Sequence, residues 1–445
     1  MLAVAPADPF GYHSRREGYV VIWDRGMETM ERSRLEDLQR TRLSWTLHWA
    51  RDRVPFYRDR LSHLKGLDEH PLEALQDLPF THKSDLRDQY PLGFLAVSRG
   101  EVRRFHASSG TRGKPTVVAY TEHDLTMWSE VVARALAAAG MQPGQTLQNA
   151  YGYGLFTGGL GLHAGAERLG VAVIPASGGG TERQVQLMLD LAPDGLAATP
   201  SYALYIAETM HHLGVSSDQL ALKTGIFGAE PWSEGMREHL ESGLGIQAVD
   251  IYGLSEITGP GVAIECVEAK AGLHVFEDFF YMEVIDPKTG ARKAPGEVGE
   301  LVLTTLSKEA MPMIRYRTGD LVSVNPEPCI CGRTSMRMSR IHGRSDDMLI
   351  VRGVNVFPSE IERVLLSQPG VSAHYQLCWE GHPSRPDLVV EIEEAQVGAL
   401  DQGALAIHLR AALGVHLSVR VVAHGHIPRS QGKAIRVINR MQEES

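Results

Sequence analysis

Between residues 171 and 256, short apolar segments alternate with longer segments that mix apolar and polar residues. Short apolar runs, which predict strands, are followed by longer stretches that are typical of helices. The predicted strands are 171–175, 196–199, 224–227 and 247–251, and the predicted helices are 182–191, 202–213 and 232–244. Strands that alternate with helices indicate a parallel sheet with helices on both faces.

The segments on either side of this region have different patterns. Residues 35–54 are rich in Leu, Arg and Trp and contain no Gly or Pro, so we expect a helix that ends before Pro55. Residues 281–286 and 300–305 predict two strands, joined by the turn-rich stretch 287–299. These strands indicate a separate β subdomain.

A compact segment of about one hundred residues follows Gly343-Arg344. Its predicted elements are a helix at 358–366, strands at 373–379 and 388–393, a helix at 402–413 and a strand at 418–422. We place the domain boundary between Ser345 and Asp346. The predicted fold class is α/β, with a large N-terminal domain (1–345) of doubly wound sheets and a β subdomain, and a small α+β C-terminal domain (346–445).

Composition narrows the class of protein. The chain has 445 residues, 43% of them hydrophobic and 22% charged, which is ordinary for a globular protein with more than one core. A net charge of −10 argues against a general nucleic-acid binder. There is no apolar run of about eighteen residues and no secretory pattern at the start, so we expect neither a membrane span nor export. Four cysteines do not form a secreted disulfide framework, and we expect a cytoplasmic protein.

The stretch Ala107 to Pro115 reads Ala-Ser-Ser-Gly-Thr-Arg-Gly-Lys-Pro and suggests a phosphate-binding loop. Small residues let backbone N–H groups converge on phosphate oxygens, and Lys114 adds a positive charge. The spacing differs from that of a Walker loop, which argues against a kinase or GTPase. The alternative for the stretch alone is a plain surface turn.

Six further motifs follow in order along the chain. They are 227–231 (Phe-Gly-Ala-Glu-Pro), 250–256 (Asp-Ile-Tyr-Gly-Leu-Ser-Glu), 316–320 (Tyr-Arg-Thr-Gly-Asp), 343–347 (Gly-Arg-Ser-Asp-Asp), 352–355 (Arg-Gly-Val-Asn) and 428–433 (Pro-Arg-Ser-Gln-Gly-Lys). Together with the phosphate loop, this order resembles the adenylate-forming superfamily of acyl-CoA synthetases, luciferases and peptide-synthetase adenylation domains. Segments 350–358 and 151–159 are similar to its phenylacetate–CoA ligase branch. The resemblance covers nearly the whole chain.

The resemblance implies an ATP-dependent aryl-CoA ligase. Such an enzyme joins a phenylacetate- or benzoate-type acid to AMP, releases pyrophosphate, and then transfers the acyl group to the thiol of CoA. The implied partners are the aryl acid, ATP with Mg²⁺, and CoA. One alternative is an enzyme that loads an anthranilate- or hydroxyanthranilate-type acid onto a carrier protein. Another is a non-catalytic adenylate-binding protein that keeps the fold. A homodimer also stays open.

The resemblance assigns the reacting groups at four places. The loop residues Ser108, Ser109, Gly110, Thr111, Gly113 and Lys114 would cradle the β- and γ-phosphates, with Arg112 where the family usually has threonine. Glu256 would be the Mg²⁺ ligand, because a hard cation prefers carboxylate oxygen. Lys433 would balance charge at the α-phosphate and the attacked carboxylate. Arg344 would act at the ribose or the phosphates.

The same resemblance assigns the rest of the nucleotide site. Tyr252 would stack on adenine, and Asp320 would accept the ribose hydroxyls. The remaining nucleotide-binding residues would be Gly228, Ala229, Glu230, Pro231, Asp250, Ile251, Gly253 and Ser255. By themselves these motifs are ordinary turns, caps and surface charges.

The acid pocket and the thioester step depend on two other regions. Tyr151, Gly152, Tyr153, Phe156 and Gly158 form a glycine-and-aromatic loop that could hold a planar ring, or could be a packed core loop. In the family the small domain rotates between two poses and acts as a mobile lid. The resemblance places the hinge at Asp346 and the approach of CoA at Gly353.

Four further residues suggest a metal site. Cys329 and Cys331 form a Cys-x-Cys pair, and Cys266 and His274 complete a Cys₃His set for a structural zinc. Four protein ligands leave no open position, so we expect no catalytic role for such a metal. The alternative is a group of buried free cysteines.

Overall fold

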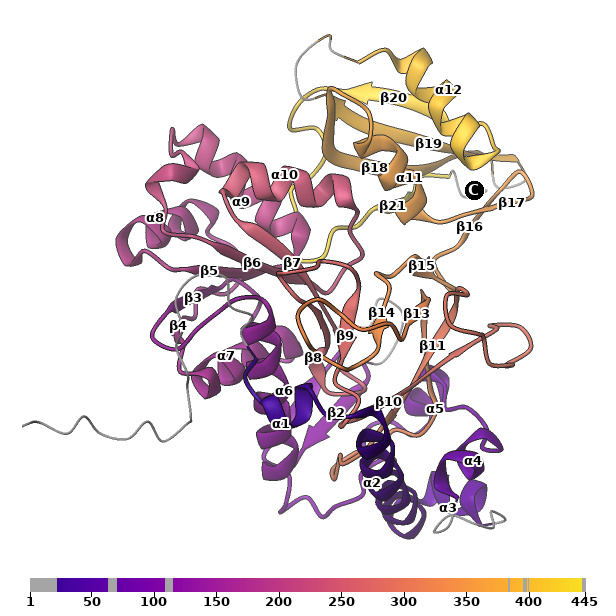
Figure 1. The fold of residues 1–445 in the computed structure, drawn as a ribbon. Coiled ribbons are helices and arrows are strands. Elements are labelled where there is room, and N and C mark those ends of the chain that lie inside the picture. Colours follow the sequence, from indigo (N-terminus) through magenta and orange to yellow (C-terminus); the bar gives the residue numbers. More distant parts are fainter. Residues whose placement is uncertain are drawn as a thin grey trace, which may run out of the picture.

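The computed structural model describes residues 22–62, 70–108, 115–382, 385–394, 398 and 400–441. A large N-terminal part holds most of the chain, and the C-terminal elements form a smaller body above it (Figure 1). Among the described residues, no helix is both long enough and apolar enough to span a bilayer. The α/β fold class and the large and small domains expected from the sequence are confirmed.

The central sheet has nine strands, in the order β13-β14-β9-β8-β7-β6-β5-β3-β4. Five of them are mutually parallel: β7 (Gln247–Leu254), β6 (Thr224–Gly228), β5 (Gly195–Ala198), β3 (Thr146–Asn149) and β4 (Ala172–Ile174). This half is the sheet that the alternating pattern predicted. The other half is antiparallel and was not predicted: β8 (Gly259–Glu265), β9 (Leu273–Val275), β14 (Arg337–Met338) and β13 (Val324–Asn325).

Helices cover both faces of the central sheet, as predicted. On one face lie α6 (Glu122–Ala138) and α7 (Thr157–Leu169), and on the other α8 (Thr181–Leu191), α9 (Pro200–His212) and α10 (Glu234–Leu244) (Figure 1). Helix α9 begins two residues earlier than expected, because the Thr199 side chain caps it by accepting a hydrogen bond from the Tyr202 N–H. Proline at the first helical position fits this start.

The β subdomain is a four-stranded antiparallel sheet, in the order β10-β11-β12-β15. Its strands are β10 (Phe280–Ile285), β11 (Gly299–Thr305), β12 (Tyr316–Val322) and β15 (Gly343–Arg344). The two predicted strands are therefore present, with two more beside them. The register between β12 and β15 sets Asp320 opposite Arg344.

The N-terminal segment is mainly helical. Its elements are α1 (Arg25–Glu28), α2 (Arg32–Arg53), α3 (Pro55–Leu61), α4 (Pro71–Gln76), α5 (Lys83–Asp88) and the hairpin of β1 (Arg104–Ala107) and β2 (Val117–Tyr120). The predicted helix before Pro55 is α2, which begins a few residues earlier than expected.

The C-terminal domain is a four-stranded sheet with two helices. Its strands are β18 (Val371–His382), β19 (Arg385–Glu394), β20 (Ser418–Val422) and β21 (Val437–Asn439), in the order β20-β19-β18-β21. Helices α11 (Pro358–Leu366) and α12 (Gln402–Leu413) pack on the sheet, and a hairpin of β16 (Leu349–Val351) and β17 (Val354–Val356) precedes it. The expected boundary at 345–346 falls between β15 and β16 and stays a prediction.

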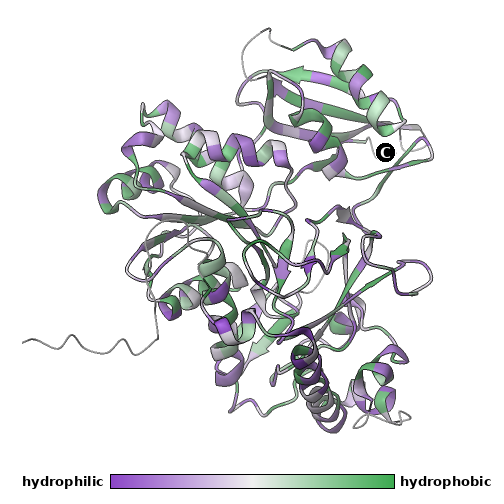
Figure 2. Ribbon diagram, in the orientation of Figure 1, coloured by the Kyte–Doolittle hydropathy of each residue, from purple (hydrophilic) through white to green (hydrophobic). Residues whose placement is uncertain are grey.

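Hydrophobic residues are frequent along the strands, and hydrophilic residues are frequent on the helices (Figure 2). One buried apolar cluster fills the space around the central sheet, α6 and the β subdomain. A second cluster joins α8, α9 and α10 to the sheet and helices of the C-terminal domain. The two domains therefore share apolar contacts in the described pose.

Candidate active site

Three side chains form a connected group at the end of the central sheet. The Tyr252 hydroxyl donates to Oδ2 of Asp320 at 2.6 Å, and Nη1 of Arg344 donates to Oδ1 at 2.7 Å. Their strands β7, β12 and β15 bring together residues that are 68 and 24 positions apart. We call Tyr252, Asp320 and Arg344 the Tyr252 triad. All three were predicted to lie in the nucleotide site.

Burial and charge act against each other in this triad. Burial raises the pKa of Asp320 above its ordinary value, although the Arg344 guanidinium opposes the shift. Burial would lower the pKa of Arg344, but Asp320 and Asp346 outweigh it and raise that pKa. The side chains of Asp320 and Arg344 thus hold each other in place before any ligand is bound.

The turn after β6 carries the motif Gly228-Ala229-Glu230-Pro231. A Cβ on Gly228 would lie 2.0 Å from the Ile251 carbonyl oxygen, so only glycine fits between β6 and β7. Ala229 has a left-handed φ of 73°, which turns the chain away from the sheet. The Glu230 carboxylate accepts hydrogen bonds from the N–H of Ser201 at 2.7 Å and of Ala434 at 2.8 Å.

Glu256 lies in the turn after β7 and is buried. Lys83 of α5 approaches its Oε1 to 3.3 Å as an ion pair, but no hydrogen bond to this atom is formed among the described residues. The fully buried Lys308 donates to the carbonyls of Glu256 at 3.2 Å and Ile257 at 2.6 Å. A buried carboxylate oxygen without a hydrogen bond fits a Mg²⁺ ligand. Lys83 and Lys308 were missed by the sequence analysis, because isolated lysines give no local signal.

Other residues of the 250–256 motif lie inside the fold. Burial and the nearby Glu265 carboxylate raise the pKa of Asp250 to about 8. Ile251 belongs to the buried core, and the Ser255 hydroxyl lies 3.1 Å from that of Thr157. Gly253 pairs with Pro260 across β7 and β8. These four residues shape the turn that holds Glu256.

Lys433 reaches this region from the C-terminal domain. Its ammonium lies 5.8 Å from the centre of the Phe156 ring. Among the described residues it has no hydrogen bond or ion pair, although Glu230, Glu256 and Asp320 lie near enough to act on it electrostatically. Burial is the largest influence and lowers the pKa of Lys433 below its ordinary value. Lys433 as a whole keeps an exposed surface, so its ammonium, which has no such partner in the described part of the chain, is accessible to an anionic ligand.

The glycine-and-aromatic loop lies next to Lys433. Tyr151 is buried, and Phe156 precedes α7 as its N-cap residue. The Tyr153 hydroxyl accepts a hydrogen bond from Asn149 at 2.9 Å and lies 3.1 Å from Nδ1 of His163. A Cβ on Gly158 would lie 2.5 Å from the Phe156 ring. Gly152 has open space where a side chain would be. The glycines of this loop therefore let its aromatic rings pack closely against the loop backbone.

The phosphate loop is only partly described. Ser108 donates its backbone N–H to the Thr116 carbonyl at 2.9 Å, and Ala107 donates to the Leu155 carbonyl at 2.9 Å. The start of the loop is therefore tied to the acid-pocket loop. The remaining predicted residues, Ser109, Gly110, Thr111, Arg112, Gly113 and Lys114, lie outside the described residues.

The two residues assigned to the lid movement lie in different places. Asp346 accepts from Nε of Arg344 at 2.9 Å, directly beside the Tyr252 triad. Gly353 lies in the turn between β16 and β17, and no other heavy atom is within 4 Å of its ideal Cβ position. The structure thus brings Asp346 to the candidate site in this pose, but not Gly353.

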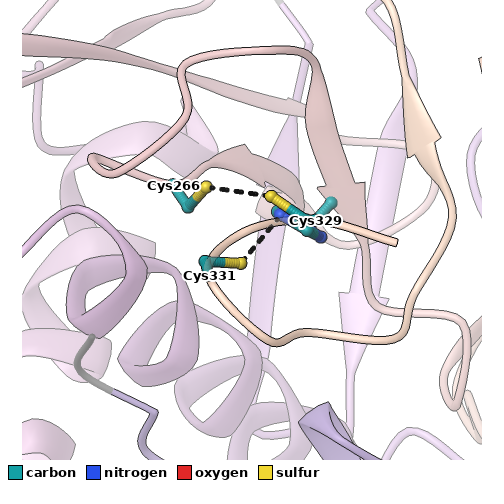
Figure 3. Close-up of side chains that lie close together, drawn as sticks. Cys266, Cys329 and Cys331 are labelled. Atoms are coloured by element: carbon teal, nitrogen blue, oxygen red, sulfur yellow. Dashed lines mark hydrogen bonds between the residues drawn. The ribbon is translucent and has the colours of Figure 1, made fainter. Parts of the chain in front are cut away.

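The predicted metal ligands do come together. The ligand atoms of Cys266, His274, Cys329 and Cys331 all lie within 4.8 Å of one another, and the four residues are buried. Sγ of Cys266 and Cys329 are 3.7 Å apart, and Sγ of Cys331 is 3.4 Å from Nε2 of His274 (Figure 3). In a tetrahedral zinc site with Zn–S bonds of about 2.3 Å, sulfur atoms are about 3.8 Å apart. The donor set therefore fits zinc.

Comparisons with known proteins agree with this geometry. Residues 105–307 match the model of the AMP-binding enzyme family, and residues 353–441 match the AMP-binding enzyme C-terminal domain. The chain is 51% identical over 433 residues to the phenylacetate–coenzyme A ligase of Thermus thermophilus, covering 92% of this chain and 97% of the relative. The chain belongs to the phenylacetate–CoA ligase family. Relatives of the same name in Pseudomonas putida and Escherichia coli are each 48% identical, over 93% of this chain and 96% of theirs.

Membership in the phenylacetate–CoA ligase family confirms the reaction expected from the sequence. The protein is an AMP-forming acid–CoA ligase, which adenylates a carboxylic acid with ATP and then forms a CoA thioester. ATP and CoA are its substrates, and Mg²⁺ is general to the family. The superfamily and the phenylacetate–CoA ligase branch named from the motifs are confirmed as well.

Solved structures of a related ligase show two arrangements of the domains, and this chain resembles one of them more. A 2-hydroxyisobutyryl-CoA ligase in its postadenylation state, with an acyl-AMP bound, has a TM-score of 0.88 and 27% identity, covering 97% of this chain and 94% of the other. The same ligase in its thioesterification state has a TM-score of only 0.72 at 28% identity, over 98% and 95% of the two chains. The domain arrangement described here is therefore closer to the postadenylation one.

Proposed function

We propose that the acid is aromatic and of the phenylacetate type. The observation that carries this proposal is the 48–51% identity, over more than nine tenths of the chain, to several phenylacetate–coenzyme A ligases. The Phe156 ring beside the Lys433 ammonium, in a loop that also carries Tyr151 and Tyr153, supports it. A planar ring could lie against these rings, with its carboxylate directed to the cation.

We further propose how the site carries out adenylation. Adenine lies against Tyr252 and the turn Gly228–Pro231, and the ribose hydroxyls donate to Asp320. The loop 108–114 binds the β- and γ-phosphates. Glu256 would hold Mg²⁺, which supplies positive charge against the phosphates. The acid carboxylate attacks the α-phosphorus, pyrophosphate leaves, and Lys433 stabilises the negative charge that gathers between them.

The thioester step requires a different pose in this proposal. The C-terminal domain (346–445) rotates about Asp346, which withdraws Lys433 and brings the hairpin with Gly353 to the site. The CoA thiol then attacks the acyl carbonyl, and AMP leaves with the electrons of the broken bond. The open space around Gly353 and the two poses of the related ligase support this account.

We also propose one structural zinc in the Cys₃His cluster. Cys266 directly follows β8 and His274 lies in β9, whereas Cys329 and Cys331 come from the connection between β13 and β14. A metal there would tie the antiparallel half of the central sheet together. With four protein ligands no position is left for a substrate.

A panel of acids tests the proposed substrate. Pyrophosphate release would be measured with phenylacetate, benzoate, anthranilate and 2-hydroxyisobutyrate, each with CoA, with a holo-carrier protein, and with no thiol. We expect the highest kcat/KM with phenylacetate, and thioester only with CoA. Preference for 2-hydroxyisobutyrate would contradict the aromatic pocket, and thioester only on the carrier protein would contradict CoA as acceptor.

A further inference from the structure

Helix α9 of the large domain contacts the C-terminal domain at two places. At its beginning, the Thr199 hydroxyl donates to the Gly432 carbonyl at 2.8 Å, next to Lys433. Nine residues later, which is about 13 Å along a helix, Glu208 faces the C-terminal domain again. One rigid helix thus contacts both the residue before the lysine and a second point on the same domain.

Glu208 contacts two side chains of the C-terminal domain, Arg429 and His374. Its Oε2 accepts from Nε of Arg429 at 2.8 Å, and its Oε1 lies 2.5 Å from Nε2 of His374 on β18. Arg429 and His374 are largely buried, and Glu208 keeps 22% of its side-chain surface exposed. Burial would raise the pKa of Glu208, but His374 and Arg429 outweigh it and hold that pKa below its ordinary value.

Arg429 is oriented from within its own domain. Both of its terminal nitrogens donate to the buried Glu393 carboxylate of β19, at 2.8 Å each. This forked contact fixes the guanidinium plane and leaves the Nε edge for Glu208. If the C-terminal domain turns away, Arg429 keeps Glu393, and the partly exposed Glu208 can be hydrated. Separation therefore leaves no buried charge without a partner.

Arg429 precedes Lys433 by four residues, and the chain between them is short. Beyond the lysine, the Ala434 N–H donates to Glu230 at 2.8 Å. The segment with Lys433 is thus held by Arg429 on one side and Ala434 on the other. Of these contacts, the pair of Arg429 and Glu208 is the one between two charged side chains.

We propose that Glu208 is a positioning residue for adenylation, which holds the C-terminal domain in the described pose by receiving Arg429 and His374 and is released before thioester formation. This inference rests on the proposed role of Lys433. In this proposal Glu208 contacts neither the nucleotide nor the acid. It acts by holding Lys433 in place. The chemistry of each half-reaction is otherwise unchanged.

The test measures the two half-reactions separately in the full-length enzyme. Single-turnover pyrophosphate release reports adenylation, and thioester formation from supplied acyl-adenylate and CoA reports the second step. For Glu208→Gln we expect about a tenfold loss of adenylation, the size of one contact to a charged group, and thioester formation that is unchanged or faster. Glu208→Lys, which repels Arg429, should lose more in the same direction.

Two controls make the outcome decisive. Glu238→Gln and Glu238→Lys alter an exposed carboxylate on the neighbouring helix α10 and should change neither half-reaction. Thermal unfolding of each variant checks that it is folded. Equal losses in both half-reactions, or no loss with either Glu208 variant, would overturn the positioning role. Lys433→Ala separates the two proposals: if it leaves adenylation intact, the role of the lysine fails, whatever Glu208 does.

Discussion

The Tyr252 triad and the Lys433 segment face the same site but are built in opposite ways. In the triad, each polar group is already paired: Asp320 receives both Tyr252 and Arg344. Lys433 has no hydrogen bond or ion pair among the described residues, and its segment is held to the large domain by contacts that can separate. The difference indicates a preformed binding surface and one movable charge. Binding groups should therefore serve both half-reactions, whereas the movable charge should serve one.

Removing the movable charge is expected to have the largest effect. Lys433→Ala should lower adenylation by about 10²–10³-fold, the range found when one group that stabilises transition-state charge is lost. Thioester formation from supplied acyl-adenylate should remain close to normal. The two rates are measured as pyrophosphate release and as CoA consumption. Equal losses in both would mean that Lys433 belongs to the preformed surface.

Asp320→Asn is the matching change on the preformed surface. It removes the charge that orders Arg344 and that would accept the ribose hydroxyls. We expect a loss of about 2 kcal/mol of binding, seen as a roughly 30-fold rise in KM for ATP and a similar rise for acyl-adenylate in the second step. A loss confined to adenylation would contradict the proposed difference between the Tyr252 triad and the Lys433 segment.

The pH profile gives a smaller effect with a defined sign. Only the protonated Lys433 carries charge, and burial lowers its pKa below the ordinary 10.5. The kcat/KM of adenylation should therefore fall as pH rises through that lowered pKa, and do so below pH 10.5. Thioester formation from supplied adenylate should lack this alkaline limb. Lys433→Arg, which stays protonated, should move the limb upward, and an identical limb in both half-reactions would contradict the assignment.

The smallest catalytic effect is expected at the Cys₃His cluster, which belongs neither to the Tyr252 triad nor to the Lys433 segment. We expect one zinc per chain by elemental analysis. Cys331→Ser should lose the metal and lower the melting temperature by a few degrees, with kcat unchanged below that temperature. Cys378→Ser is the matched control, since Cys378 is buried in the C-terminal domain and outside the cluster. A chain without zinc would identify the cluster as free thiols.

The sequence predicted what repeats locally or resembles a known motif. The parallel strands and their helices follow from patterns within about ten residues, and they occur as expected. The antiparallel strands β8 and β9 follow the motif 250–256 in the chain and were not predicted. Their register depends on partners across the sheet, which no local pattern contains.

Contacts between distant residues that belong to no motif could not be predicted from the sequence. The ion pair of Lys83 with Glu256 joins two elements of the large domain, and that of Glu208 with Arg429 joins residues 221 positions apart. A single lysine or glutamate in a helix is usually a solvated surface residue. What gives these residues their significance is burial and proximity, and only the folded chain supplies both. The motif residues of the Tyr252 triad could be named in advance because their order along the chain resembles a family.

Gly228 has a consequence for any attempt to give this enzyme a new substrate. The space between β6 and β7 at this position is too small for even a single methyl group. A larger residue would spread the strands and displace Tyr252 and its neighbours together. Libraries of variants should therefore leave position 228 fixed and vary the ring-facing positions, where Gly152 has unfilled volume beside it. In a control library that randomises both positions, selection should return glycine at 228 in every active clone and a range of side chains at 152.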